Sequence, residues 1–247
     1  MALGKSLAML LLSGMLFVSS YLIKVYSDEI RKIYLVPGHD SRECSRRAVG
    51  KAGREDELAI KFASKLEKKL KEKDKDLTVI RTRNSEGYSK DLIKFVKKDL
   101  NKSYLDIDYF SLLEEEAKYI NHDSSGSLVL NIHFDKVDYD ICKIKGFSFI
   151  YDDENPKICE SIQLAFSESR AFIKNGLKPS NNYDCDDGIT MGRGFHLIGK
   201  TNAPTLIIEF DSIDNEKLND PNYRDKLLNA ACEGAIDYKK NHKHLQD

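Results

Sequence analysis

The stretch Ile33-Tyr34-Leu35-Val36-Pro37-Gly38-His39 sets the organisation of the chain. Its apolar residues predict a short buried strand, and Pro37-Gly38 ends that strand abruptly. His39 therefore stands at the carboxyl end of a strand, where α/β sheets keep their binding and catalytic groups. Taken alone, a histidine at this position is consistent with three roles: metal ligand, general base or turn residue. The residues further along the chain must distinguish among these roles.

Length and composition indicate one domain. The 247 residues are 41% hydrophobic and 32% charged, which is enough for one sizeable core. The 39 basic and 40 acidic residues give a formal net charge of -1. The composition therefore lacks the excess of positive charge that is typical of nucleic-acid-binding proteins. We expect a monomer with no nucleic-acid partner, and other partners must be inferred from individual sites.

Residues 1–25 differ in composition from the rest. Lys5 precedes an uncharged apolar run over 6–23, which is typical of an export signal, and Val18-Ser19-Ser20 allows cleavage after Ser20. The run also reaches the roughly 18 residues of a spanning helix, so an uncleaved anchor is the alternative. We predict residues 1–25 as a signal peptide or signal anchor. Residues 26–247 would then lie outside the cytoplasm, in the periplasm or cell envelope or secreted, and would contact a membrane only through the N-terminal segment.

The cysteines do not form a metal or redox motif. None of the five is spaced as C-x-x-C, which argues against a zinc ribbon or a thioredoxin-type site. An odd number in an exported protein permits a disulfide and leaves at least one thiol unpaired. The residues are Cys44, Cys142, Cys159, Cys185 and Cys232.

Strand and helix patterns alternate along the chain. Beyond the first strand, further strands are predicted at 77–82, 127–133, 146–151 and 205–210, and helices at 54–70, 111–121, 156–172 and 223–238. Polar residues and glycines predict loops at 40–53 and 181–194. The fold class is therefore α/β: a single domain with a twisted, mainly parallel sheet and helices on both faces.

The segment 84–108 is predicted as a helical insertion. Leu92, Phe95 and Val96 recur among lysines, as in a short amphipathic helix. The segment is either a surface flap, or a lid or docking element for a protein regulator.

Three predicted strands end in or carry a group that binds metals or transfers protons: His39, His133 and Glu209. Glu55 joins them, because it opens the helix after the first strand and that helix begins at the same edge of the sheet. Glu57 is an alternative to Glu55, but the apolar phase of the helix fits Glu55 better.

Two imidazoles and one carboxylate with an open fourth position are the ligand set of a catalytic zinc ion. Hydrolysis also needs a carboxylate outside that set, which takes a proton from water and passes it to the leaving nitrogen. Glu209 suits this role. It stands among Leu206, Ile207, Ile208 and Phe210, where an unpaired carboxylate is costly to bury.

Several motifs together carry a resemblance to a known family. They are Val36-Pro-Gly-His39, Ala48-Val-Gly50, Gly53-Arg-Glu55, Val79-Ile-Arg-Thr-Arg83, Asn131-Ile-His133, and Pro204-Thr-Leu-Ile-Ile-Glu209-Phe followed by Asn215. In this order they are similar to the zinc-dependent N-acetylmuramoyl-L-alanine amidases of the amidase 3 type. The resemblance runs from about Ile33 to the last helix.

The resemblance implies a role for each of these residues. His39, Glu55 and His133 would bind Zn2+, and Glu209 would act in catalysis. The expected reaction is cleavage of the amide between N-acetylmuramic acid and L-alanine, which makes peptidoglycan the partner and residues 26–247 an amidase-like catalytic domain.

Three further residues are candidates for substrate contact: Arg83, His196 and Asn131. Arg83 would orient a carboxylate or pair with one. A purely structural role is the alternative for His196.

The chain departs from the family pattern beside its ligands. Val36 stands where an aspartate is usual, Asp40 and Ser41 replace glycines, and Glu116 replaces an arginine. The residues around His133 also differ, at Asn131, Phe134 and Asp135. None of these changes removes a ligand. They keep two alternatives open: a zinc amidase or peptidase on another peptide, and a zinc-binding but inactive wall-binding or scaffold protein.

Overall fold

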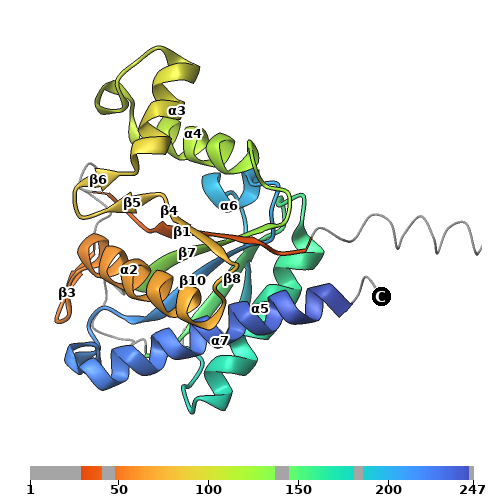
Figure 1. Ribbon diagram of the computed structural model, residues 1–247. Coiled ribbons are helices and arrows are strands. Elements are labelled where there is room, and N and C mark those ends of the chain that lie inside the picture. The colour runs from red at the N-terminus through yellow and green to blue at the C-terminus, as the bar shows by residue number, and fades with distance from the viewer. Residues whose placement is uncertain (1–28, 41–47, 137–144, 181–185, 245–247) are drawn as a thin grey trace, which may run out of the picture.

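A six-stranded sheet forms the centre of the molecule in a computed structural model, which describes residues 29–40, 48–136, 145–180 and 186–244 (Figure 1). The strand order is β4-β1-β7-β10-β8-β9. The strands are β1 (Lys32–Pro37), β4 (Thr78–Arg81), β7 (Ser127–Asp135), β8 (Ser148–Asp152), β9 (Ile189–Gly192) and β10 (Thr205–Ser212). Strands β4, β1, β7 and β10 are parallel, whereas β8 runs antiparallel to β10. The predicted single α/β domain with a mainly parallel sheet is confirmed.

Helices cover both faces of this sheet (Figure 1). One face packs against α2 (Glu55–Lys73), α5 (Ile158–Lys174) and α7 (Pro221–His244), and the other against α4 (Tyr109–Asn121) and α6 (His196–Lys200). The central strands β1, β7 and β10 are almost entirely buried, as expected for parallel strands covered on both sides. Within the described residues, no helix has the length and apolar character needed to cross a membrane.

Side-chain alternation in β7 and β10 decides which groups face the α4 and α6 side. Leu128, Leu130 and Ile132 point into the larger core beneath α2, α5 and α7, whereas Val129 packs with residues of α4 and α6. His133 has the same phase as Val129, because successive side chains of a strand point to opposite faces. Glu209 is paired with His133 in the register of β10 and β7, so both side chains lie on the α4 and α6 side.

Some predicted loops contain regular structure. The loop expected at 40–53 includes a hairpin of β2 (Val49–Gly50) and β3 (Gly53–Arg54), and the prediction for 181–194 is wrong at β9. Strand β9 is short and takes its conformation from pairing with β8, which no local pattern reveals. The first residues of the chain, including the predicted signal over 1–25, lie outside the described residues.

The segment 84–108 holds a helix, as predicted, and begins with part of a hairpin. Its elements are β5 (Arg83–Asn84), β6 (Gly87–Tyr88), α3 (Lys90–Leu100) and the short η1 (Tyr104–Asp106). Leu92 and Val96 of α3 pack against Ile107 and Leu112, which attaches the segment to α4. Its role as a lid or docking element stays a prediction.

Two cysteines fall within the described residues. Cys159 is exposed and Cys232 is buried, and both are free thiols. Cys44, Cys142 and Cys185 lie outside the described residues, so a disulfide among them stays a prediction.

Candidate metal centre

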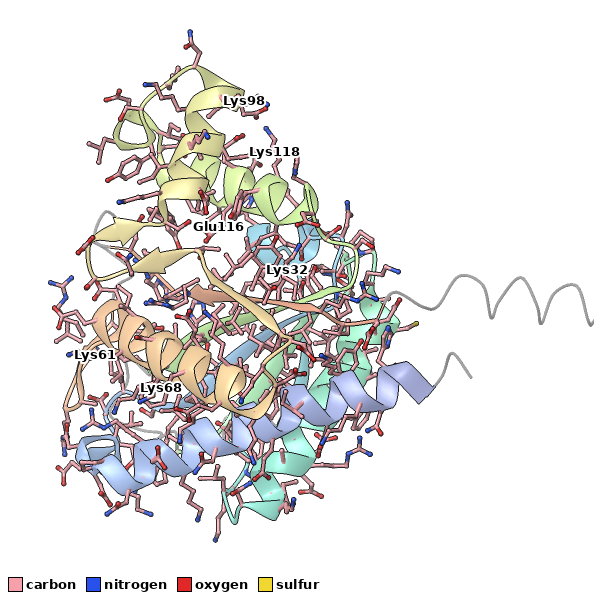
Figure 2. All side chains as sticks on the ribbon, viewed as in Figure 1. Lys32, Lys61, Lys68, Lys98, Glu116 and Lys118 are labelled. Carbon is pink, nitrogen blue, oxygen red and sulfur yellow. The ribbon has the colours of Figure 1, made fainter. Side chains whose placement is uncertain are left out.

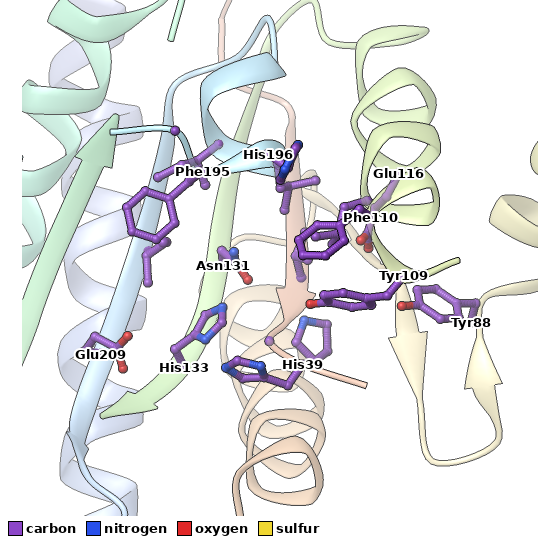
Figure 3. A pocket seen from close by; sticks show the side chains of 18 residues that line it. His39, Tyr88, Tyr109, Phe110, Glu116, Asn131, His133, Phe195, His196 and Glu209 are labelled. Carbon is purple, nitrogen blue, oxygen red and sulfur yellow. The ribbon is translucent and has the colours of Figure 1, made fainter. Parts of the chain in front are cut away.

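His39 is delivered to the centre by an unusual turn after β1. The N–H of Gly38 donates to the carbonyl of Ile132 at 2.7 Å, which continues the β1 and β7 pairing to the strand end. His39 itself has a φ of 51°, in the left-handed region that few non-glycine residues adopt. This turn directs the imidazole toward Glu55 at the start of α2 and toward His133 near the carboxyl end of β7. Figure 3 shows the two histidine rings side by side.

Glu55 is the first residue of α2 and is 3% exposed. Its N–H donates to the carbonyl of Ala48 at 3.0 Å, so the β2 and β3 hairpin holds the helix start in place. A carboxylate in the first helical turn is stabilised by the partial positive charge of the helix N-terminus.

His133 comes from β7 and lies directly beside Gly38. A Cβ at position 38 would stand 2.3 Å from Cε1 of the His133 ring, closer than any real contact. The glycine before His39 is therefore needed for the space that the second histidine occupies.

The three side chains converge on a single carboxylate oxygen. Oε1 of Glu55 lies 3.3 Å from Nε2 of His39 and 3.3 Å from Nδ1 of His133. The two rings are 4.9 Å apart at 79°, and one donor atom of each residue falls within 4.8 Å of the others. Burial by itself raises the pKa of Glu55, but hydrogen bonds and charge from His133 and His39 lower it to about 2, so the carboxylate is ionised.

These residues fit a zinc ion. Two ligand atoms held about 2.1 Å from one ion at the tetrahedral angle stand about 3.4 Å apart, close to the spacing between Glu55 and each histidine. The set combines nitrogen and oxygen donors and leaves a fourth position, as catalytic zinc sites do. The N–H of Phe134 also donates to Oε1 of Glu55 at 3.2 Å and helps to orient the carboxylate.

Glu57, the alternative ligand, is placed elsewhere. Its side chain is 53% exposed, and its Oε1 lies 3.4 Å from Nε of Arg54. Arg54 also donates to both carboxylate oxygens of Asp56, at 3.0 and 2.6 Å. Glu55 is thus the one acidic residue of this helical turn that the structure brings to the two histidines.

Glu209 lies on β10 across the pocket from His39 (Figure 3). Its Oε2 is buried and has no hydrogen-bond partner within the part of the chain that the structure describes. Burial raises the pKa of Glu209 well above its usual value, and the negative charges of Glu55 and Asp135 raise it further. A carboxyl group with a raised pKa is suited to exchange protons near neutral pH.

The strand after Glu209 is anchored by Asp211, which is fully buried. Its Oδ1 accepts from the N–H of Gly146 at 3.0 Å, and its Oδ2 accepts from Asn215 at 2.8 Å and from the hydroxyl of Tyr223 at 2.5 Å. These bonds fix the end of β10 and hence the position of Glu209.

A pocket of about 300 Å³ connects the two candidate histidine ligands, His39 and His133, with Glu209. It is walled by the ends of β1, β7 and β10, by α4, by α6 and by Tyr88 of the β5 and β6 hairpin. The residues that line it are Val36, Pro37, Gly38, His39, Tyr88, Tyr109, Phe110, Leu113, Glu116, Asn131, His133, Gly194, Phe195, His196, Leu197, Ile198, Ile207 and Glu209.

Two of the three residues expected to contact substrate line this pocket. Asn131 is 7% exposed and its Oδ1 has no hydrogen-bond partner within the described ranges. His196 stands at the start of α6, with its ring 5.2 Å from that of Phe110. Arg83 is not among the lining residues: it is 5% exposed, and its Nη2 donates to the carbonyls of Pro37 and Gly38 at 3.0 and 2.6 Å.

The sequence did not reveal the aromatic walls of the pocket. Tyr109 and Phe110 are the first residues of α4, which begins two residues before the predicted helix start. Phe195 is the residue directly before α6. The one available signal for the earlier start of α4 was Asp108, because aspartate is preferred at the N-cap of a helix. Its carboxylate accepts from the N–H of Ser111 at 3.0 Å.

The chain matches the model of one protein family over most of its length. The family is N-acetylmuramoyl-L-alanine amidase, of the Amidase_3 type, and the match covers residues 33–237. A comparison with curated proteins gives no match.

Solved structures share the fold. An N-acetylmuramoyl-L-alanine amidase from Clostridium difficile 630 is 19% identical with a TM-score of 0.62, and the match covers 85% of this chain and 97% of that one. The amidase Ami1 from Mycobacterium smegmatis is 15% identical with a TM-score of 0.62, covering 87% and 100%. The CwlD amidase from Clostridioides difficile, solved in complex with the GerS lipoprotein, is 19% identical with a TM-score of 0.62, covering 85% and 99%.

The family match includes the three metal candidates and Glu209, and the structures that are similar to this chain share its sheet and helices over nearly their whole length. The chain belongs to the N-acetylmuramoyl-L-alanine amidase family.

Proposed function

We propose that the protein hydrolyses the amide bond between N-acetylmuramic acid and L-alanine in peptidoglycan, with a zinc ion bound by His39, Glu55 and His133. The observation that carries the proposal is the meeting of Nε2 of His39 and Nδ1 of His133 at one oxygen of Glu55, where the two histidines line the same pocket as Glu209. Family membership supplies the substrate class.

Each residue has a part in this reaction. A zinc ion at this position would supply a Lewis acid for the scissile carbonyl and for the attacking water. Glu209 takes the proton of that water and passes it to the nitrogen of L-alanine as the bond breaks, a transfer that its raised pKa supports. Asn131 and His196 contact the substrate from the pocket wall.

The cellular setting is part of the same proposal. Residues 1–25 would export the protein, and it would act on the wall as a monomer. The CwlD amidase was solved together with a lipoprotein, which makes a protein regulator at the segment 84–108 a proposal for this chain as well.

The test is to incubate the purified zinc-loaded protein with peptidoglycan and to identify the products by mass spectrometry. Free stem peptides that begin with L-alanine are expected. They should disappear with a chelator and in Glu209→Ala, because that variant has no carboxylate for proton transfer, while one equivalent of zinc stays bound. Glu216→Ala is the matched control, since Glu216 is exposed and pairs only with the surface residue Lys51 among the described residues.

Other outcomes separate the alternatives. Binding to intact sacculi with no peptide released by wild type would favour the inactive wall-binding protein. Release of peptides that begin at another residue would favour an amidase or peptidase with a different scissile bond.

A further inference from the structure

One wall of the pocket is the short helix α6 together with Phe195, the residue directly before it. Residues 195–198 all line the pocket. Figure 3 shows Phe195 and His196 at one end of the pocket and Glu209 at the other. A second wall is α4, and Figure 2 shows its residue Glu116 beneath that helix and inside the molecule. The position of α6 therefore sets the shape of the pocket away from the metal candidates.

A helix as short as α6 depends on the rest of the fold for its position. It covers only His196–Lys200, and isolated helices of this length are not stable in water. Its buried residues Leu197 and Ile198 pack into two separate apolar clusters. Because apolar contacts are not directional, polar groups that bond to its backbone should decide where its first residues stand.

Asp152, the last residue of β8, is one such group. It is 0% exposed, and its Oδ2 accepts from the N–H of Phe195 at 2.9 Å. Its Oδ1 accepts from the N–H of Glu154 at 2.8 Å, which fixes the orientation of the carboxylate. A Cβ at Gly199 would stand 3.3 Å from the same carboxylate, so α6 packs directly against it. Asp152 thus joins the start of α6 to the sheet.

Asn155 bonds to the other end of α6. It is 3% exposed, and its Nδ2 donates to the carbonyl of Ile198 at 2.5 Å and to the hydroxyl of Thr201 at 3.3 Å. Its Oδ1 accepts from the N–H of Lys157 at 2.7 Å. The turn between β8 and α5 therefore holds α6 at both ends.

The ring of Phe195 lies against β9. Gly192 of β9 is paired with Asp152 in the register of β8 and β9. A Cβ at Gly192 would stand 2.3 Å from Cε2 of the Phe195 ring, closer than any real contact. Phe195 nevertheless remains 40% exposed. Two paired residues of neighbouring strands thus determine its position, Asp152 through its backbone and Gly192 through its ring.

Asp152 is separate from the groups proposed for the chemical step. Ser148 at the start of β8 is paired with Glu209, whereas Asp152 ends that strand. Neither Asp152 nor Gly192 is among the residues that line the pocket. A substitution at either residue should therefore change how the substrate is held and leave the metal candidates and Glu209 in place.

We propose that Asp152 and Gly192 are positioning residues for substrate binding, which act through Phe195 and His196. Asp152 fixes the backbone at the start of α6, and Gly192 leaves the space that the Phe195 ring occupies. The inference rests on the proposed function for its substrate, but it concerns the binding of that substrate and not its cleavage.

The experiment measures kcat and KM of the zinc-loaded full chain on a soluble N-acetylmuramoyl peptide that begins with L-alanine. Asp152→Ala is expected to raise KM by about tenfold or more, the scale of losing a hydrogen bond to a charged group. It should change kcat by less than about twofold, because the lost contact acts on binding alone. Gly192→Ala should also raise KM, since its Cβ displaces the Phe195 ring.

Glu154→Ala is the matched control, because Glu154 is an exposed carboxylate of the same turn, and it should keep the KM of wild type. Circular dichroism and zinc content report whether each variant is folded. A general loss of folded protein would lower kcat per chain and leave KM unchanged. An unchanged KM in Asp152→Ala, or an equal rise in Glu154→Ala, would overturn the inference. If Asp152→Ala does not fold, an unchanged KM in Gly192→Ala would overturn it.

A binding arm separates this inference from the proposed function. The same peptide is titrated into zinc-loaded wild type, Asp152→Ala and Gly192→Ala by calorimetry. If wild type binds the peptide without cleaving it and both variants bind about tenfold more weakly, the proposed function fails and the positioning role stands. If all three cleave and bind it equally, the positioning role fails and the proposed function stands. No binding and no cleavage by wild type would overturn both.

Discussion

Arg83 contacts the backbone of a candidate metal ligand without being a candidate ligand itself. It is buried, its guanidinium bonds to the two peptide carbonyls before His39, and its Cζ lies 5.9 Å from the centre of the Tyr88 ring. His39 holds a left-handed backbone conformation, which persists only when its surroundings determine it. Arg83 is thus placed to position the candidate ligand His39.

Replacing Arg83 by methionine is expected to weaken zinc binding by about 10- to 100-fold, the usual effect of losing a group that orients a ligand. The measurement is competition with a chromophoric chelator. Arg81→Met is the control, because Arg81 is more exposed and pairs with Glu67. Equal zinc affinity in wild type and Arg83→Met would show that the turn at His39 holds without the guanidinium.

Gly38→Ala is expected to remove zinc binding without unfolding the protein, since its Cβ would collide with the His133 ring at 2.3 Å. Zinc content after gel filtration is the measurement, with circular dichroism as the check on folding. Gly199→Ala serves for comparison, because a Cβ there comes no closer than 3.3 Å to Asp152. Retention of one zinc per chain by Gly38→Ala would contradict the steric argument.

At the level of the elements, the contact between α5 and α7 contains a carboxylate that, like that of Glu209, has a buried oxygen. Glu168 is 0% exposed, and neither of its oxygens has a hydrogen-bond partner among the described residues. A Cβ at Gly234 of α7 would stand 2.4 Å from its Oε2, so the helices pack closely there. Burial raises the pKa of Glu168 well above its usual value, and Asp237 raises it further.

A raised folded-state pKa predicts stability that is lost as pH rises. Above its ordinary pKa of 4.5, the carboxyl loses its proton in the unfolded chain but keeps it in the folded one. Each pH unit between that value and the raised pKa should then cost about 1.4 kcal/mol of unfolding free energy. Glu168→Gln is expected to remove this slope.

Urea unfolding at pH 5, 6, 7 and 8 measures the effect as the difference between Glu168→Gln and wild type. Glu233→Gln is the control, since Glu233 lies on α7 beside Lys174 at the surface. A difference that stays constant with pH would mean that Glu168 is ionised in the folded state.

For the whole molecule, the candidate metal centre links β1, α2 and β7, so zinc bound there should stabilise the entire domain. A ligand at 1,000 times its dissociation constant adds about 4 kcal/mol if it binds only the folded state. We expect zinc to raise the Tm of wild type and a chelator to reverse the shift. His133→Ala should not respond, whereas His122→Ala at the end of α4 should respond as wild type does. A similar shift in His133→Ala would place the stabilising zinc elsewhere.

The sequence was most informative where a short local pattern is enough to predict an element of secondary structure. The apolar runs ending at His39 and His133 and the run around Glu209 predicted three sheet strands, because a buried parallel strand is apolar along its whole length. The order of strands and helices then predicted the class of fold, and the position of the chemical groups at strand ends predicted where they would meet.

Other features depended on contacts between distant parts of the chain. Strand β9 exists through its pairing with β8, and Arg83 became a support for His39 only because β4 lies beside β1. The aromatic residues of α4 and α6 line the same pocket, although the two helices are far apart in the sequence. No sequence spacing predicts that they come together.

By itself, the sequence determined the α/β class and the identity of the candidate ligands, because strand and helix periodicity and the chemistry of His39, Glu55, His133 and Glu209 are local properties. Only the tertiary structure placed Glu55 against both histidines, left Glu57 exposed beside Arg54, and brought Glu116 and the aromatic residues of α4 to one pocket. Those outcomes follow from helix phase, strand register and burial, which are decided when segments far apart in the chain pack together.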